Sequence, residues 1–107
     1  MLAKRNRIVR GDEFRRIVRS GERRGTSVAV VHRATAAEPV SRFGFVVSKK
    51  VGNSVVRNRI KRRLSEVVRA ELPLEIPTDV VIRALPAAAH ADLATLKAGI
   101  VPLLRRP

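Results

Sequence analysis

Apolar residues recur along the chain with two different spacings, and these spacings predict its helices and strands. Residues 12–20 hold an i, i+3, i+4 stripe, which is typical of an amphipathic helix. The stripe consists of Phe14, Ile17 and Val18. Asp12 can cap the start of this helix, and Gly21 can end it in the left-handed conformation that glycine adopts easily. The pattern predicts a first helix over residues 12–20.

Two segments rich in β-branched residues come next. SVAVVHRA, residues 27–34, and RFGFVVS, residues 42–48, have the composition of strands. The connection over residues 35–41 contains Pro39 and small residues, as surface loops do. The pattern predicts two adjacent strands that pair antiparallel.

The helical spacing returns in VVRNRIKRRLSEVVR, residues 55–69, although this segment is rich in Arg and Lys. At 100° per residue, five apolar side chains share one face: Val56, Ile60, Leu64, Val67 and Val68. The opposite face holds Asn58, Arg62, Ser65 and Arg69. Ser54 can accept a hydrogen bond from the first N–H groups of the helix, and Pro73 cannot continue it. We predict a helix from Ser54 to about Leu72.

One more strand and one more helix complete the pattern. DVVIRAL, residues 79–85, is typical of a buried strand and makes a parallel pairing possible. An amphipathic helix over residues 93–104 follows, with Asp92 as its N-cap and with Gly99 and Pro102 as weak points. Its apolar positions are Leu93, Leu96, Ile100, Leu103 and Leu104.

The order of these elements predicts the fold class. Residues 1–10 carry four cations and no acid, which favours a frayed basic terminus. Because no linker or repeat interrupts the rest, we expect a single domain over residues 1–107. The predicted class is an α+β sandwich of helices against a sheet, in the order α-β-β-(β)-α-β-α, where the bracketed strand is not assigned to particular residues.

The charge narrows the choice of partner. Lys and Arg number 23 against 9 Asp and Glu, so the chain of 107 residues has a formal charge of +14. Such an excess favours binding to a polyanion, and nucleic acid is the expected one. A membrane is the competing polyanion, but the sequence has no apolar run of membrane length, no signal peptide and no lipidation motif. We expect a soluble, cytoplasmic protein.

Residues for catalysis or metal binding are hard to assemble. There is no cysteine, and His32 and His90 are isolated, so neither a zinc site nor a disulfide framework is expected. The acids are scattered: Asp12 and Asp92 are expected to be helix caps, and Glu66 a surface charge of the basic helix. We predict no catalytic residue and no metal ligand in the polypeptide, which therefore resembles a binding protein.

The basic helix carries like charges close together. Residues 57–63 contain five cations and no acid: Arg57, Arg59, Lys61, Arg62 and Arg63. A charge run is often only a solvated face, but ordinary solvated helices mix both signs, and like charges three or four residues apart cost stability. Phosphates would offset this cost through charge-assisted contacts.

The residues that carry these charges resemble a known signature. FVVSKKVGNSVVRNRIKRRLSEVVR, residues 45–69, is similar to the signature of the protein subunit of bacterial ribonuclease P, with its SKK strand end, Gly-Asn turn and Arg-Asn-Arg helix. The N-terminal KRNRI…EF…V…SG pattern extends the resemblance over nearly the whole chain. That ribonucleoprotein removes the 5′ leader of precursor tRNA. The resemblance implies that its RNA subunit is the catalyst, with Mg²⁺ bound mainly by the RNA, and that the βαβ crossover is left-handed.

The resemblance also implies two sets of contacts. The catalytic RNA would meet Lys49, Lys50, Arg57, Asn58, Arg59, Lys61, Arg62 and Arg63. A cleft for the single-stranded 5′ leader would contain Phe14, Val18 and His32. Relatives often have aromatic side chains where this chain has Val18 and His32, so stacking on the leader would be arranged differently. From the sequence, Phe14 fits a core position as well as it fits a stacking position.

Two other classes of nucleic-acid binder compete with this interpretation. A structural RNA-binding protein of ribosomal type would share the charge and the fold without any role in cleavage. A DNA-binding regulator is disfavoured because no helix-turn-helix pair with a short turn is present. We expect a monomeric protein that binds one ribonuclease P RNA and precursor tRNA.

Overall fold

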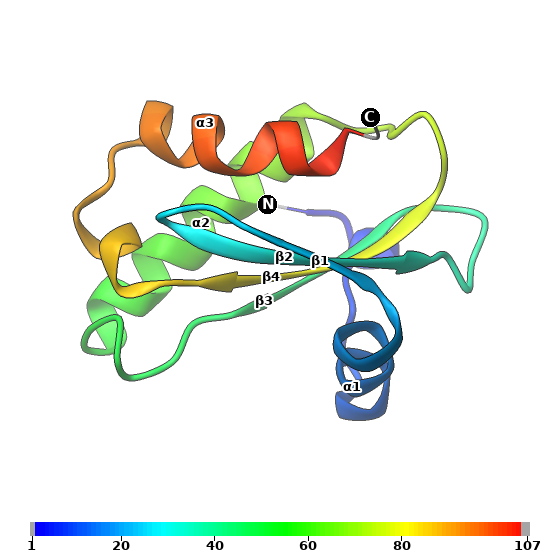
Figure 1. Cartoon of the computed structure of the whole chain (residues 1–107), viewed down its shortest axis with the longest axis horizontal. Helices are drawn as coiled ribbons and strands as arrows, with labels where there is room; N and C mark the ends of the chain where they lie inside the picture. Colours follow the sequence, from blue (N-terminus) through cyan, green and yellow to red (C-terminus); the bar gives the residue numbers. More distant parts are fainter. Residues whose placement is uncertain (1, 106–107) are drawn as a thin grey trace.

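The computed structural model describes residues 2–105 as one sheet with helices on both faces (Figure 1). In chain order the elements are η1 (Lys4–Asn6), α1 (Gly11–Ser20), β1 (Glu22–Gly25), β2 (Ala29–Thr35), β3 (Arg42–Val46), α2 (Ser54–Ala70), β4 (Thr78–Ala84), η2 (Pro86–His90) and α3 (Leu93–Leu104), where η marks a 3₁₀ helix. The α+β class and the order α-β-β-(β)-α-β-α are confirmed. The strand that the sequence left unassigned is β1, whose residues are all exposed.

The sheet has the strand order β1-β2-β4-β3. β2 pairs antiparallel with both β1 and β4, whereas β3 pairs parallel with β4, with Phe43 opposite Val80. The prediction that residues 27–34 and 42–48 pair with each other is therefore wrong, and the parallel pairing is confirmed. β4 lies between them because its residues are buried on both faces, which suits a central position.

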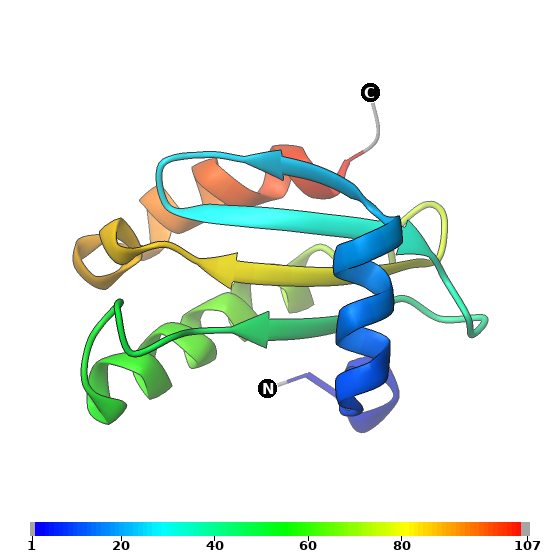
Figure 2. The ribbon, with the colours of Figure 1, turned by 60° about the horizontal axis from the view of Figure 1, so that its bottom comes forward.

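The connection from β3 through α2 to β4 has an unusual hand. Figure 2 shows β3 and β4 pointing the same way, with α2 behind the sheet and β4 reached in the left-handed sense. Most such units are right-handed. The left-handed crossover that the family resemblance implied is confirmed.

The main core lies between the sheet and the pair α2 and α3 (Figure 1). α2 contributes the buried side chains Ile60, Leu64, Val67 and Val68, as its apolar spacing predicted. The helix begins one residue away from the predicted cap: Asn53, not Ser54, accepts a hydrogen bond from the Val56 amide at 3.0 Å. It ends at Ala70, two residues before the predicted end.

α3 packs closely against the hairpin of β1 and β2. Its predicted cap is confirmed, because Asp92 accepts a hydrogen bond from the Thr95 amide at 2.8 Å. Gly99 is required at the contact, since a Cβ there would lie 2.5 Å from a methyl group of Val28. Pro102 lies inside the helix, which continues to Leu104.

α1 crosses the opposite face of the sheet (Figure 2) and differs from the prediction at both ends. It begins at Gly11, and Asp12 does not cap it but accepts hydrogen bonds from Arg10. Gly21 has a φ of −84°, so it is not left-handed. Its lack of a side chain serves packing instead, because a Cβ would lie 2.3 Å from the carbonyl oxygen of Arg33.

The N-terminal segment is ordered against the sheet, so the prediction of a frayed terminus is wrong for residues 2–10; Met1 lies outside the described residues. Leu2 and Ile8 are buried. Arg7 bridges to Phe43 of β3 in parallel, and Ile8 donates its amide to the Phe43 carbonyl at 2.9 Å. The two buried apolar side chains and these backbone contacts hold this basic segment along the edge of β3.

Candidate nucleic-acid interface

The first half of α2 and the turn before it form a cationic surface. Val51 donates its amide to the Ser48 carbonyl at 3.1 Å, which closes a turn that leaves Lys49 and Lys50 exposed. The Asn53 cap then starts α2 directly after the turn. Of the predicted RNA contacts on α2, Asn58, Lys61 and Arg62 are exposed, and Arg57, Arg59 and Arg63 are partly buried. The structure thus brings the eight predicted RNA contacts onto one helix and the adjoining turn.

Two of these arginines also hold the chain together. Arg63 donates from Nη1 to the carbonyl oxygen of Ala91 at 3.0 Å, and Arg59 donates from Nη2 to that of Ala89 at 3.4 Å. Both carbonyls belong to the connection between β4 and α3. A charged donor stabilises such carbonyls more than a neutral one does. Sequence reasoning assigned both arginines to RNA and missed this structural role.

Arg57 and Arg59 each have one N–H group without a hydrogen-bond acceptor in the described part of the chain. The Nε atoms of Arg57 and Arg59 are buried and have no hydrogen-bond partner among residues 2–105. An unsatisfied buried donor costs free energy, so an acceptor supplied by a bound molecule would be favourable here.

The predicted leader residues lie on the α1 face of the sheet. Phe14 and Val18 come from α1 and line a hollow of about 410 Å³ that is open to solvent. Phe14 is partly buried against the small cluster of Ile8, Ile17 and Val81, whereas Val18 is 46% exposed. Phe14 therefore serves both as a packing residue and as part of the wall. The full lining is Phe14, Arg15, Val18, Arg19 and Val46, and we call this hollow the α1 groove.

His32 lies on the same face of the sheet but does not line the α1 groove. It pairs across the strands with Arg23 and Val81, and cross-strand partners point to the same face. Its side chain is only 4% exposed, and its Nδ1 has no partner among the described residues. Burial, together with the positive charges of Arg83 and Arg23, lowers the pKa of His32. The imidazole is therefore neutral at pH 7.

Acidic and metal-binding groups are sparse around this surface. Within residues 2–105, no group of three or more His, Cys, Asp or Glu side chains could hold a metal ion. The described side chains therefore do not fit a magnesium site made by the protein alone.

None of the described helices is both long enough and apolar enough to span a bilayer.

Comparison with known proteins identifies the family to which the chain belongs. A family model described as Ribonuclease P matches residues 2–107. The chain belongs to the ribonuclease P protein family. The resemblance of residues 45–69 is thereby confirmed, and the role in removing the 5′ leader of precursor tRNA follows from the family.

Individual relatives agree over most of their length. The ribonuclease P protein component of Micrococcus luteus is 44% identical over 110 residues, which cover 91% of this chain and 83% of that protein. The corresponding protein of Beutenbergia cavernae is 52% identical over 100 residues, with the same coverage. A solved Staphylococcus aureus RNase P protein mutant with defective mRNA degradation activity is 29% identical and superimposes with a TM-score of 0.87, covering 94% of this chain and 86% of that one.

Three residues that line the α1 groove were not predicted from the sequence: Arg15, Arg19 and Val46. Arg15 and Arg19 were not singled out, although they lie four residues apart and directly follow the predicted cleft residues Phe14 and Val18. Val46 was assigned to a strand without a role. The helical spacing of Arg15 and Arg19 could have indicated a shared position, but only the strand order shows that Val46 lies opposite them.

Proposed function

We propose that this chain is the accessory subunit of ribonuclease P and that the RNA subunit is the catalyst. The observation that carries the proposal is the acid-free cationic surface formed by Lys49, Lys50 and the first half of α2. Exposed cations placed in this way release counterions from RNA and offset phosphate repulsion between the catalytic RNA and its substrate. The whole chain acts as one RNA-binding domain.

The second part of the proposal concerns the precursor tRNA. Its single-stranded 5′ leader would lie in the α1 groove, where Phe14 offers an aromatic face, Val18 and Val46 offer apolar contact, and Arg15 and Arg19 offer charge. This combination of a stacking surface with cations is common in proteins that bind single strands. His32, which is buried on the same face of the sheet and does not line the groove, would not stack on a base.

Magnesium would be held mainly by the RNA of the ribonucleoprotein. The described part of the chain offers no group of three or more His, Cys, Asp or Glu side chains that could hold the ion. The protein would act on metal use indirectly, by lowering the repulsion that magnesium otherwise has to screen. We propose that the protein is monomeric, binds one RNA and works in the cytoplasm.

The direct test is cleavage of precursor tRNA by a bacterial ribonuclease P RNA at low magnesium, with and without this protein. We expect the protein to raise the cleavage rate strongly and to cleave nothing by itself. Metal-dependent cleavage by the protein without RNA would contradict the accessory role. Tight RNA binding without any gain in cleavage would favour the alternative, a structural RNA-binding protein of ribosomal type.

A further inference from the structure

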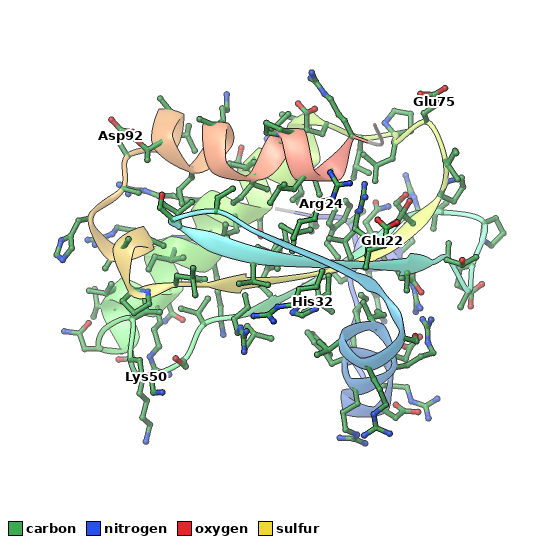
Figure 3. The ribbon with its side chains drawn as sticks, in the orientation of Figure 1. Glu22, Arg24, His32, Lys50, Glu75 and Asp92 are labelled. Atoms are coloured by element: carbon green, nitrogen blue, oxygen red, sulfur yellow. The ribbon has the colours of Figure 1, made fainter. Side chains whose placement is uncertain are left out.

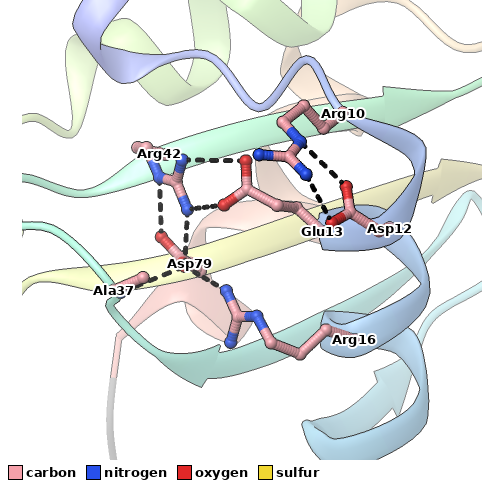
Figure 4. A network of polar contacts seen from close by, with 7 residues as sticks. All are labelled: Arg10, Asp12, Glu13, Arg16, Ala37, Arg42 and Asp79. Carbon is pink, nitrogen blue, oxygen red and sulfur yellow. Dashed lines mark hydrogen bonds and ion pairs between the residues drawn. The ribbon is translucent and has the colours of Figure 1, made fainter.

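A buried carboxylate ties α1 to the sheet through residues that lie outside the predicted RNA contacts (Figure 4). Asp79, near the start of β4, has no exposed surface. Its carboxylate accepts hydrogen bonds from Arg16 Nη2 at 2.6 Å, from Arg42 Nε at 3.2 Å and Nη2 at 3.1 Å, and from the Ala37 amide at 3.2 Å. A buried carboxylate with this many hydrogen-bond donors holds the elements that supply those donors in fixed positions relative to one another.

Arg42 extends the network to a second carboxylate. Its Nη1 and Nη2 donate to the two carboxylate oxygens of Glu13 on α1, at 3.2 Å and 2.5 Å. Arg42 is therefore held between Asp79 of β4 and Glu13 of α1 (Figure 4). Arg16, one helical turn after Glu13, reaches Asp79 as well. Two side chains of α1, Glu13 and Arg16, are thus bonded to β3 and β4 through a network centred on the buried Asp79.

The network and the α1 groove lie on opposite flanks of α1. At 100° per residue, Glu13 and Arg16 fall on one flank, and Phe14 and Val18 fall on the other. Ile17, which is fully buried, lies between the two flanks and faces the sheet. A rotation of α1 about Ile17 would therefore move the groove wall whenever the network on the far flank changed.

On the flank of α1 that faces the α1 groove, Phe14 makes a close contact with the sheet that depends on the orientation of the helix. The Phe14 ring lies directly over Gly44 of β3, where a Cβ would come within 2.5 Å of two ring atoms. The apolar support of α1 is otherwise small, consisting of Ile8, Ile17 and Val81 with a few partly buried neighbours. Such a small cluster leaves the orientation of α1 dependent on the polar contacts on its other flank.

We propose that Asp79, Arg42 and Glu13 are positioning residues for the 5′ leader, because they set the rotation of α1 and so the shape of the α1 groove. None of the three lines the groove. The inference rests on the proposed function, since it assumes that the leader occupies this groove. It adds three residues to the reaction that neither the Arg-Asn-Arg signature nor the groove itself indicates.

The test compares Glu13→Gln and Asp79→Asn with the unchanged protein in the reconstituted ribonucleoprotein. Two precursor tRNAs are used, one with a leader long enough to fill the groove and one with a leader too short to reach it. We expect KM for the long-leader precursor to rise by about tenfold, because a small displacement of a binding wall is costly. KM for the short-leader precursor and kcat for both should stay unchanged.

Two control variants and a folding check make the result specific. Glu75→Gln removes an exposed carboxylate far from α1 and should change neither precursor. Phe14→Ala removes the groove wall directly, and combining it with Glu13→Gln should add little to the loss, since both act on one surface. Glu13 is only partly buried, so Glu13→Gln keeps the test valid if Asp79→Asn fails to fold, which circular dichroism would reveal.

The outcomes separate this inference from the proposed function. Equal losses on both precursors, or additive losses in the double variant, would overturn the positioning role and indicate general destabilisation. No loss on the long-leader precursor would also overturn it. If the unchanged protein stimulates neither precursor, the proposed function itself fails, and the positioning role fails with it.

Discussion

At the scale of single residues, neighbouring cations of α2 have different surroundings. Arg62 is exposed, whereas Arg63 is partly buried and bonded to the Ala91 carbonyl. Adjacent side chains on a helix point about 100° apart, so one meets solvent while the next meets the connection before α3. The basic first half of α2 therefore contains cations that are free to face solvent and cations that already stabilise the fold.

We expect Arg62→Ala and Arg63→Ala to separate these two properties. Arg62→Ala should lower the salt slope of RNA binding by about one unit, as the loss of one phosphate contact does, and should change the free energy of unfolding by less than about 0.5 kcal/mol. Arg63→Ala should lower the free energy of unfolding by about 1–2 kcal/mol through the lost charged hydrogen bond. Urea denaturation and RNA titrations at several salt concentrations measure both quantities. A stable Arg63→Ala variant would contradict the structural role.

His32 gives a pH dependence whose sign follows from its surroundings. Its pKa is lowered from 6.5 in the folded chain by burial and then by Arg83 and Arg23, so the unfolded chain binds more protons between the two values. The stability that this group contributes is therefore present above pH 6.5 and lost as the pH falls through the folded pKa. His32→Gln should reduce the difference in unfolding free energy between about pH 7.5 and about pH 5.5. An NMR titration midpoint of His32 at or above 6.5 would contradict this prediction.

At the scale of elements, α1 and α2 are supported in different ways. α2 buries four apolar side chains in the main core, whereas α1 buries only Ile17. α1 therefore depends on Phe14, on the Asp79 network and on its close approach to Gly44. Elements with few buried apolar contacts open at lower free energy than the core does, so α1, which forms the wall of the α1 groove, should be less stable than α2.

The contact between Phe14 and Gly44 can be tested with one methyl group. Gly44→Ala should push the Phe14 ring away from the sheet and lower the free energy of unfolding by about 1–3 kcal/mol, the usual cost of overpacking. Amide hydrogen exchange should accelerate in α1 before it does so in α2.

Gly25→Ala provides the matched control for this substitution. Gly25 is also a strand glycine, but a Cβ there would meet its nearest neighbours at 3.7 Å and 3.9 Å, which is ordinary contact. It should leave the exchange of α1 unchanged. Equal effects of the two substitutions would show that loss of glycine in a strand, not the contact with Phe14, causes the change.

The elements also show what a sequence can and cannot reveal. A helix from Ser54 to about Leu72 was predicted because apolar spacing and cap chemistry are local; the cap shifted from Ser54 to Asn53, and the helix ends at Ala70. β1 was not located because its residues Glu22–Gly25 are all exposed and show no apolar alternation. The strand order was wrong because the long-range pairing of β2 with β4 leaves no trace in the short loop that joins β2 to β3.

For the candidate site, the sequence supplied residue types and the structure supplies their positions, while their contacts with RNA stay a prediction. The residues of the RNA contacts and of the leader cleft came from the family resemblance, and the structure places the RNA contacts on one helix and one turn, and Phe14 and Val18 in one groove. The hydrogen bonds of Arg59 and Arg63 and the network around Asp79 join residues 28 to 63 positions apart. No spacing rule reaches across such separations, so only the fold could reveal them.

At the scale of the whole molecule, charge is distributed unevenly. Lys50 and Glu75 lie at opposite ends of the protein (Figure 3). The segment over residues 71–79 contains Glu71, Glu75 and Asp79 and no cation, in a chain of net charge +14. Asp79 is buried and Glu71 is bonded to Arg105, so Glu75 is the exposed carboxylate of this segment. The end that carries the exposed cations Lys49 and Lys50 is therefore better suited to RNA.

Two substitutions that change the charge by the same amount should show that RNA binding depends on where the charge lies. Lys50→Glu and Glu75→Lys each change the charge by two, in opposite directions. Lys50→Glu should weaken RNA binding and lower its salt slope by about one unit, whereas Glu75→Lys should leave the affinity nearly unchanged, because a Debye length of about 8 Å screens a remote charge at physiological salt. Filter binding at two salt concentrations measures both. A large gain from Glu75→Lys would mean that net charge, not its placement, controls the affinity.

The N-terminal segment along β3 has one more consequence, which concerns the protein before any RNA is bound. A sheet edge with unpaired backbone groups invites other chains to add to it, and the result is aggregation. Here the Arg7 bridge and the Ile8 amide occupy part of the β3 edge, while the β1 edge carries Glu22, Arg23 and Arg24. One edge is thus covered by the chain itself, and the other is protected by charge. Residues 2–10, which look like a loose basic tail in the sequence, therefore leave less of the β3 edge open to pairing with another copy of the chain.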